Sequence, residues 1–101
     1  MARRVIAMTK GEANWAEWAI GGMPDDPDGR EEMYGWPVPD SEMPIIQGRE
    51  LILPNDPEVL DDLLYRLEEQ SADVAECDAT SEAAIASRTR PALSLARKIR
   101  A

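Results

Sequence analysis

The most regular alternation of apolar and polar positions runs from Asp56 to Glu76 and predicts an amphipathic helix. One stripe of this segment recurs at steps of three and four residues, the period of an α-helix. Asp56 suits the N-cap because its carboxylate can accept from the free amides of the first turn, and Pro57 suits the first helical position. The stripe expected in the core consists of Leu60, Leu63, Leu64, Leu67, Ser71 and Val74.

The opposite face of this helix is acidic, and we call it the acidic rail. Its carboxylates follow one another at steps of 4, 7, 4 and 3 residues, with Arg66 filling the gap. Charged residues at such spacing share one face of a helix, which we expect to face solvent. The rail consists of Glu58, Asp62, Glu69, Asp73 and Glu76.

Two apolar runs outside the helix predict strands. Arg3 to Thr9 holds a short apolar run between charged residues, which is typical of a buried strand. Ile45 to Leu53 is the second, with Gly48 marking a turn or bulge and Pro54 ending it. We expect the two to pair as a two-stranded β-ribbon. Such a ribbon is marginal alone, so it must pack on helices or be extended by another chain, and a homo-oligomer through the strand edge is one such arrangement.

Glu12 to Ile20 predicts a short helix that ends at the glycine pair 21–22. Trp15 and Trp18 are three residues apart and therefore lie on one side of it. Tryptophans at this spacing are typical of core anchors, and the alternative is a hot spot for binding a partner.

The stretch from Gly21 to Pro44 is rich in proline and glycine and predicts an extended, irregular connection of more than 20 residues. Loops of that length in small domains are usually functional or mobile. Tyr34 and Trp36 indicate that this one is held against another surface. The run 25–29 (DDPDG) partly matches a calcium loop, but Pro24 and Gly35 occupy the first and twelfth positions, so a turn with Asx hydrogen bonds is favoured.

The C-terminal part predicts a helical pair. No glycine follows Gly48, so helical character persists to the end of the chain. The segment 77–81 lowers helix propensity and offers an N-cap, which predicts a break near 78–81 and a second helix from about Ser81 to Ile99, kinked or split before Pro91. The alternative is one continuous helix of roughly 30 residues, favoured by an alanine series that runs through the break: Ala72, Ala75, Ala79, Ala83 and Ala86.

These elements predict one small α+β domain over residues 1–101, with a strand, short helix, loop and strand in 1–55 and the helical part in 56–101. The net charge is −9, and all 20 acidic residues lie between Glu12 and Glu82, opposed there by three arginines, which leaves that block at −17. Both ends are basic. We expect the basic C-terminal tail to pack on the chain's own acidic surface; its cations are Arg88, Arg90, Arg97, Lys98 and Arg100.

The residue types exclude several kinds of chemistry. One cysteine, Cys77, and no histidine exclude an internal disulfide, a Cys/His metal site and a Cys–His nucleophile pair. The carboxylate pairs 61–62 and 68–69 lie on a predicted surface helix with no sign of the cleft that acid–base catalysis needs. We therefore expect no enzyme activity, no catalytic residues, no cofactor and no metal. Without a long apolar run or a secretory segment, we expect a soluble cytoplasmic protein with no membrane partner.

The acidic block favours a protein-binding function. We expect a non-enzymatic module that presents acidic residues to a basic, nucleic-acid-binding protein and does not itself contact nucleic acid. Carboxylates on one helix face recur every 5 to 6 Å or so, close to the separation of phosphates along a nucleic-acid strand. Phage and mobile-element inhibitors of host enzymes resemble this chain in charge and size. The expected partner-binding residues are Glu58, Asp62, Glu69, Asp73, Glu76, Asp25, Asp26, Asp28, Tyr34 and Trp36.

The second hypothesis is a small structural or accessory subunit of a larger assembly such as a phage particle. Its proline-rich arm would lie on neighbouring subunits, and its exposed strand edge would be completed by them. For a phage-encoded chain, the location would be the host cytoplasm or the virion.

Overall fold

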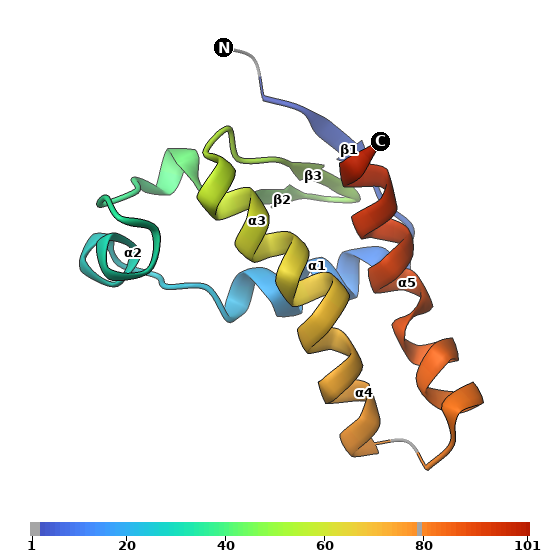
Figure 1. The fold of residues 1–101 in the computed structure, drawn as a ribbon. Helices are drawn as coiled ribbons and strands as arrows, with labels where there is room; N and C mark the ends of the chain where they lie inside the picture. The colour runs from blue at the N-terminus through green and yellow to red at the C-terminus, as the bar shows by residue number, and fades with distance from the viewer. Residues whose placement is uncertain (1–2, 79) are drawn as a thin grey trace.

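The computed structural model describes residues 3–78 and 80–101, and it combines a small antiparallel sheet with helices (Figure 1). The α+β class predicted from the sequence is therefore confirmed. In chain order the elements are β1 (Val5–Ala7), α1 (Lys10–Gly21), α2 (Pro27–Tyr34), the 3-10 turn η1 (Asp40–Glu42), β2 (Ile45–Gln47), β3 (Glu50–Ile52), α3 (Pro57–Tyr65), the π-helical turn η2 (Arg66–Gln70), α4 (Ser71–Asp78) and α5 (Glu82–Arg100).

The sheet has three strands in the order β1-β3-β2, not the two expected. The predicted second strand folds back on itself at Gly48, whose φ of 61° is in the left-handed region that glycine tolerates. Leu51 at the centre of β3 pairs with Ile6 of β1 and with Ile46 of β2, both antiparallel. The expected pairing of the two strand segments is therefore confirmed, and the two-stranded ribbon is corrected to a hairpin with one added strand.

The proline- and glycine-rich stretch is not irregular throughout, because it contains α2. The Asp26 carboxylate accepts from the Gly29 amide at 2.7 Å, and Pro27 occupies the first turn. Gly35 ends the helix with a φ of 89°. The aspartates that partly match a calcium loop therefore begin a helix. Asp56 begins α3 in the same way, which confirms the predicted start of that helix.

The C-terminal half is a helical pair, as expected, and not one long helix. α4 ends at Asp78, and α5 begins after Ser81, whose hydroxyl accepts from the Ala84 amide at 3.2 Å. α5 continues through Pro91 and is not split there. Position 79 of the alanine series lies outside the described residues.

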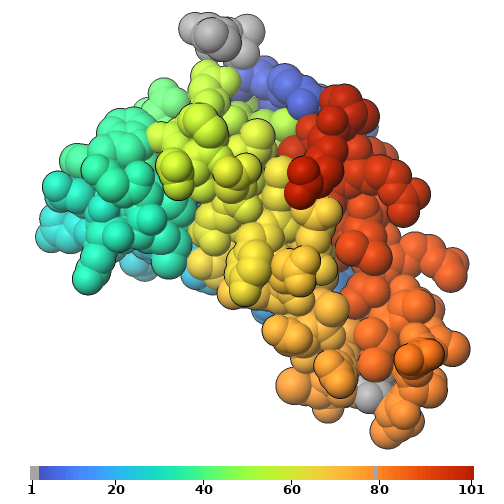
Figure 2. Space-filling model, in the orientation of Figure 1, coloured from blue at the N-terminus to red at the C-terminus, as the bar shows by residue number. Residues whose placement is uncertain are grey.

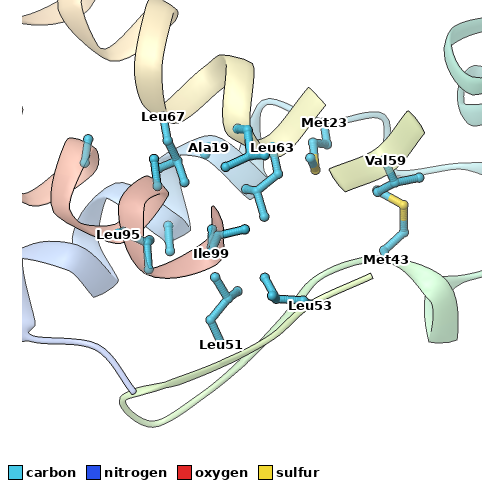
Figure 3. Close-up of a cluster of buried hydrophobic side chains, with 14 of the residues drawn as sticks. Ala19, Met23, Met43, Leu51, Leu53, Val59, Leu63, Leu67, Leu95 and Ile99 are labelled. Carbon is cyan, nitrogen blue, oxygen red and sulfur yellow. The ribbon is translucent and has the colours of Figure 1, made fainter. Parts of the chain in front are cut away.

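The core lies where α3, η2, α1, α5 and β3 meet (Figure 3). Leu63, Leu64, Leu67 and Ser71 are buried as predicted. Leu60 is only half-buried and Val74 is 37% exposed, and their places are taken by Val59 and Ala75. The turn η2 explains the shift after Leu67, because a π-turn takes in one more residue than an α-turn and so rotates the later side chains about the helix axis.

The basic tail packs on the body, and apolar burial contributes more to this packing than its exposed ion pairs do. The buried side of α5 carries residues at steps of three, one and three: Ala92, Leu95, Ala96 and Ile99. Burial of a large aliphatic side chain stabilises the fold by about 1.5 to 3 kcal/mol, whereas an exposed ion pair contributes about 0 to 1 kcal/mol. The burial of Leu95 and Ile99 therefore contributes more to stability than the exposed ion pairs of the tail. Among the helices of the described chain, none has the length and apolar character needed to cross a membrane.

Candidate partner-binding surface

Arg30 is the only cation of α2, and its charge is held inside the molecule. Its side chain is 6% exposed, and Nε donates to the Pro24 carbonyl at 3.0 Å. Nη1 donates to the Val38 carbonyl at 2.9 Å and to the Asp40 carboxylate at 2.7 Å. Buried in this way, Arg30 fixes α2 against the segment that follows it. The solvent side of α2 and its N-cap then carries carboxylates without an opposing cation: Asp25, Asp26, Asp28, Glu31 and Glu32.

Two aromatic side chains join α2 to α3. The Tyr34 hydroxyl donates to Asp62 at 2.7 Å, and the Trp36 indole donates to the carboxylate of Asp56. Burial, followed by the hydrogen bond to Asp62 and its charge, raises the pKa of Tyr34 well above its ordinary value. The hydroxyl therefore stays a donor over the physiological range. Tyr34 supports the surface from beneath, whereas Trp36 is 39% exposed.

Asp62 does not present a free charge to solvent. Its carboxylate accepts from Tyr34 and also from Arg66 Nε at 3.2 Å, and its side chain is 17% exposed. Glu58, one turn earlier, is exposed and takes part in no ion pair within the described chain. Of the rail, Glu58 is therefore a free carboxylate that lies in the sequence between Asp56 and Asp62, which bind Trp36 and Tyr34, and Asp62 acts as a link.

The remaining rail residues, Glu69, Asp73 and Glu76, are all exposed but lie on η2 and α4. The π-turn between them and Glu58 rotates the later face relative to the earlier one. The rail is therefore not one straight row. Glu58 lies in the first turn of α3, two residues after the N-cap Asp56 that Trp36 contacts, whereas Glu69, Asp73 and Glu76 lie on the other half of the helical stretch.

We define the α2–α3 acidic surface as the exposed carboxylates of α2 and of the two residues before it, together with Glu58 of α3. Figure 1 shows α2 lying to one side of α3, and Figure 2 shows it as a rounded lobe against the yellow-green start of α3. α3 contains no lysine or arginine. The surface consists of Asp25, Asp26, Asp28, Glu31, Glu32 and Glu58, and none of these is in an ion pair in the described structure.

The two tryptophans of α1 line a shallow cleft of about 310 Å³ with Gly11, Asn14, Val74 and Pro91. The ring centroids of Trp15 and Trp18 are 5.5 Å apart, and the rings are nearly perpendicular. Trp15 Nε1 donates to the Arg88 carbonyl of α5 at 3.0 Å. Trp15 is therefore a core anchor, as expected, while Trp18 is 37% exposed. The lining contains no titratable side chain.

Glu12 is a buried carboxylate that the sequence interpretation did not single out. It completes a capping box with Thr9, and it also accepts from Lys98 Nζ at 2.7 Å and from Ser94 Oγ at 2.8 Å. A threonine followed three residues later by glutamate is the signal that identifies such a box. Because the Glu12 carboxylate accepts from all of these donors, Glu12 is a structural anchor and not a reactive group.

Cys77 is exposed and has no disulfide partner. Within residues 3–78 and 80–101, no group of His, Cys, Asp and Glu side chains could hold a metal ion.

No protein family, curated protein or solved structure matches this chain. The function is therefore inferred from the exposed side chains of the described residues.

Proposed function

We propose that the protein is a non-enzymatic binding module that docks its α2–α3 acidic surface onto a basic, nucleic-acid-binding surface of a partner protein. The observation that carries the proposal is the burial of Arg30, which leaves six exposed carboxylates without an exposed cation on α2 or α3. A one-signed patch of this kind accelerates association with an oppositely charged surface and disfavours acidic partners.

The spacing of the carboxylates supports the choice of partner. Glu31 and Glu32 lie three and four residues after Asp28 on α2, which places the Cβ atom of each about 5 to 6 Å from that of Asp28. Phosphates along a nucleic-acid strand are separated by a similar distance. A groove whose lysines and arginines hold successive phosphates can therefore hold successive carboxylates of α2.

The rigidity of the surface favours binding. Arg30 fixes α2 to the loop that follows, and the Tyr34–Asp62 and Trp36–Asp56 hydrogen bonds fix α2 to α3. A surface held in place before association loses less conformational entropy on binding. Trp36 supplies a partly exposed aromatic anchor among the charges, a residue type that dominates many interfaces.

The exposure of Trp36 and Met33, at 39% and 52%, favours a second candidate, a subunit of a larger assembly held by this proline-rich arm. Its contacts would depend on the apolar side chains and not on the charges. The two candidates use the same region, so charge and apolar area must be changed separately.

The test uses two variants with the same change in net charge. Asp28→Lys/Glu31→Lys alters the proposed surface, and Glu17→Lys/Glu50→Lys alters exposed carboxylates elsewhere. Each tagged protein captures partners from lysate, and bound protein is challenged with a duplex DNA oligonucleotide. We expect the wild type and the control to retain a nucleic-acid-binding protein that the duplex displaces, and the α2 variant to retain none. Equal retention by both variants would contradict the proposal.

A further inference from the structure

The two helices α4 and α5 pack side by side and antiparallel, and the α1 tryptophans cover only one side of this pair. Val74 of α4 and Pro91 of α5 line the cleft with Trp15 and Trp18 of α1. Lys98 also points to that side, because it binds Glu12 of α1. In Figure 1, α4 and the first half of α5 extend away from the sheet as an arm. The opposite side of the pair carries a different set of side chains.

On that opposite side, α5 is basic and partly apolar. Ala86, Arg90, Leu93 and Arg97 recur at steps of four, three and four residues and line a shallow hollow of about 450 Å³. Thr89 and Ser94 complete its lining, and Ser94 marks the edge toward α1, because its hydroxyl donates to Glu12. Leu93 is 40% exposed. Arg90 and Arg97 take part in no ion pair within the described chain, whereas the other cations of α5 all do: Arg88 binds Asp78, Lys98 binds Glu12 and Arg100 binds Glu68.

On the same side, η2 and α4 are acidic. The ion pair between Arg100 and Glu68, at 2.5 Å, spans the two helices there. Leu93 and Arg97 precede Arg100 by seven and three residues, so they follow its side of α5. Glu76 lies eight residues, about two turns, beyond Glu68 and so follows its side of the helix, and Glu69, seven residues before Glu76, shares the face of Glu76. Both are exposed and without an ion pair among the described residues. One face of the pair is therefore acidic along one helix and basic along the other.

The charged residues of the two helices lie at matching positions along the helix axes, which we call heights. The ion pairs Asp78–Arg88 and Glu68–Arg100 show which positions are level in the antiparallel pair. Between them, Arg90 is level with Glu76, and Arg97 is level with Glu69. Each pair of like charges is separated by seven residues, or roughly 10.5 Å along the helix.

We propose that this face is a homodimer interface. A two-fold axis parallel to the helices places the acidic helix of each copy over the basic helix of the other and keeps the heights unchanged. Arg90 then meets Glu76 of the second copy, Arg97 meets Glu69 of the second copy, and Leu93 lies between the two contacts. A two-fold axis in the same plane but perpendicular to the helices would place like charges together, so charge selects the first arrangement.

The occupant is a second copy because the face complements itself: both signs are present, at equal spacing and equal height. The strand edge expected to mediate oligomers is not involved. Because the chains each carry −9 and Leu93 is the main apolar contact, we expect a weak dimer, in the micromolar range. The α2–α3 acidic surface stays free, so dimerisation and partner binding are separate properties.

The test is a charge exchange measured by sedimentation equilibrium. Arg90→Glu/Arg97→Glu makes both helices acidic on this face, and Glu69→Arg/Glu76→Arg makes both basic. We expect wild-type protein to dimerise and each variant alone to associate at least about tenfold more weakly. An equimolar mixture of the two variants should form a heterodimer, because each acidic helix then meets a basic one. Circular dichroism establishes that both variants are folded.

Three outcomes would overturn the proposal: wild-type protein that is monomeric into the high micromolar range, variants that dimerise like wild type, or a mixture that stays monomeric. Leu93→Ser is a third variant, which leaves the net charge unchanged. It should weaken the dimer without changing the circular dichroism spectrum. A monomeric wild type that binds a duplex DNA oligonucleotide through Arg90 and Arg97 would assign the face to nucleic acid instead.

Discussion

Lys98, in the last turn of α5, donates from its ammonium group to the Glu12 carboxylate in the first turn of α1 at 2.7 Å. Glu12 is 1% exposed and also accepts from the Thr9 amide and the Ser94 hydroxyl, both at 2.8 Å. The Lys98 ammonium donates to the Ala7 carbonyl at 3.1 Å as well. One carboxylate thus caps a helix and ties the C-terminal helix to the start of the chain.

Glu12→Gln should destabilise the protein by about 1 to 3 kcal/mol at neutral pH, because it removes the charge that Lys98 contacts within a buried site. Burial by itself would raise the pKa of Glu12, but the hydrogen bonds from Lys98, Thr9 and Ser94 and the Lys98 charge together hold that pKa below its usual 4.5. A lowered folded-state pKa contributes stability above pH 4.5, which is lost as the pH falls through the folded-state value. Denaturant titrations at several pH values measure the effect.

The difference in stability between wild type and Glu12→Gln should therefore narrow below pH 4.5. Glu17→Gln is the matched control, because Glu17 is exposed on the same helix, and it should stay within about 0.5 kcal/mol of wild type. A difference that is constant from acid to neutral pH would mean that the Glu12 charge makes no net contribution.

Leu67→Ala should cost about 2 to 5 kcal/mol in a denaturant titration, because Leu67 of η2 is fully buried in the core (Figure 3). Leu60→Ala, two turns earlier on the same stripe, should cost clearly less, since Leu60 is only partly buried. Equal losses at the two positions would contradict the burial difference that separates the observed core from the predicted stripe.

The sequence predicted α3 well because its start is encoded locally. An aspartate N-cap followed by proline is enough to identify the start at Asp56. The same pair occurs at Asp26 and Pro27, but the surrounding prolines and glycines favoured a loop. Gly35, which served there as a loop signal, is the left-handed residue that ends α2.

Other features could not be predicted because they depend on residues far apart in the chain. Tyr34 and Asp62, both expected at the binding surface, are 28 positions apart and satisfy each other. The apolar spacing around Leu67 does not reveal the π-turn η2, yet this turn makes the side chains of Glu58 and Glu69 point in different directions about the helix axis. The charge pattern predicted an acidic surface, but the burial of Arg30 that isolates part of it depends on tertiary contacts with Val38.

Arg30→Lys should destabilise the protein by about 1 to 3 kcal/mol although it keeps the charge. A lysine ammonium cannot reproduce the planar guanidinium contacts with Pro24, Val38 and Asp40, so buried carbonyls lose donors. Asp40→Asn is the control, because the Asp40 side chain is 90% exposed and should contribute little. Thermal melting compares the two, and a harmless Arg30→Lys would show that α2 is held by other contacts.

Trp36 separates the two proposed functions. Trp36→Ala removes a partly exposed aromatic ring and leaves all six carboxylates of the α2–α3 acidic surface in place. If charge drives binding, this variant should keep its rate of association and lose affinity through faster dissociation, while Asp28→Lys/Glu31→Lys should slow association sharply. If the protein is instead an assembly subunit held by apolar contacts, Trp36→Ala should prevent its incorporation, and Asp28→Lys/Glu31→Lys should not. Binding kinetics of the captured partner at two ionic strengths distinguish these cases, because a steered encounter slows as salt increases and an apolar one does not. An association rate that is insensitive to both salt and the α2 lysines would refute the charge-driven function.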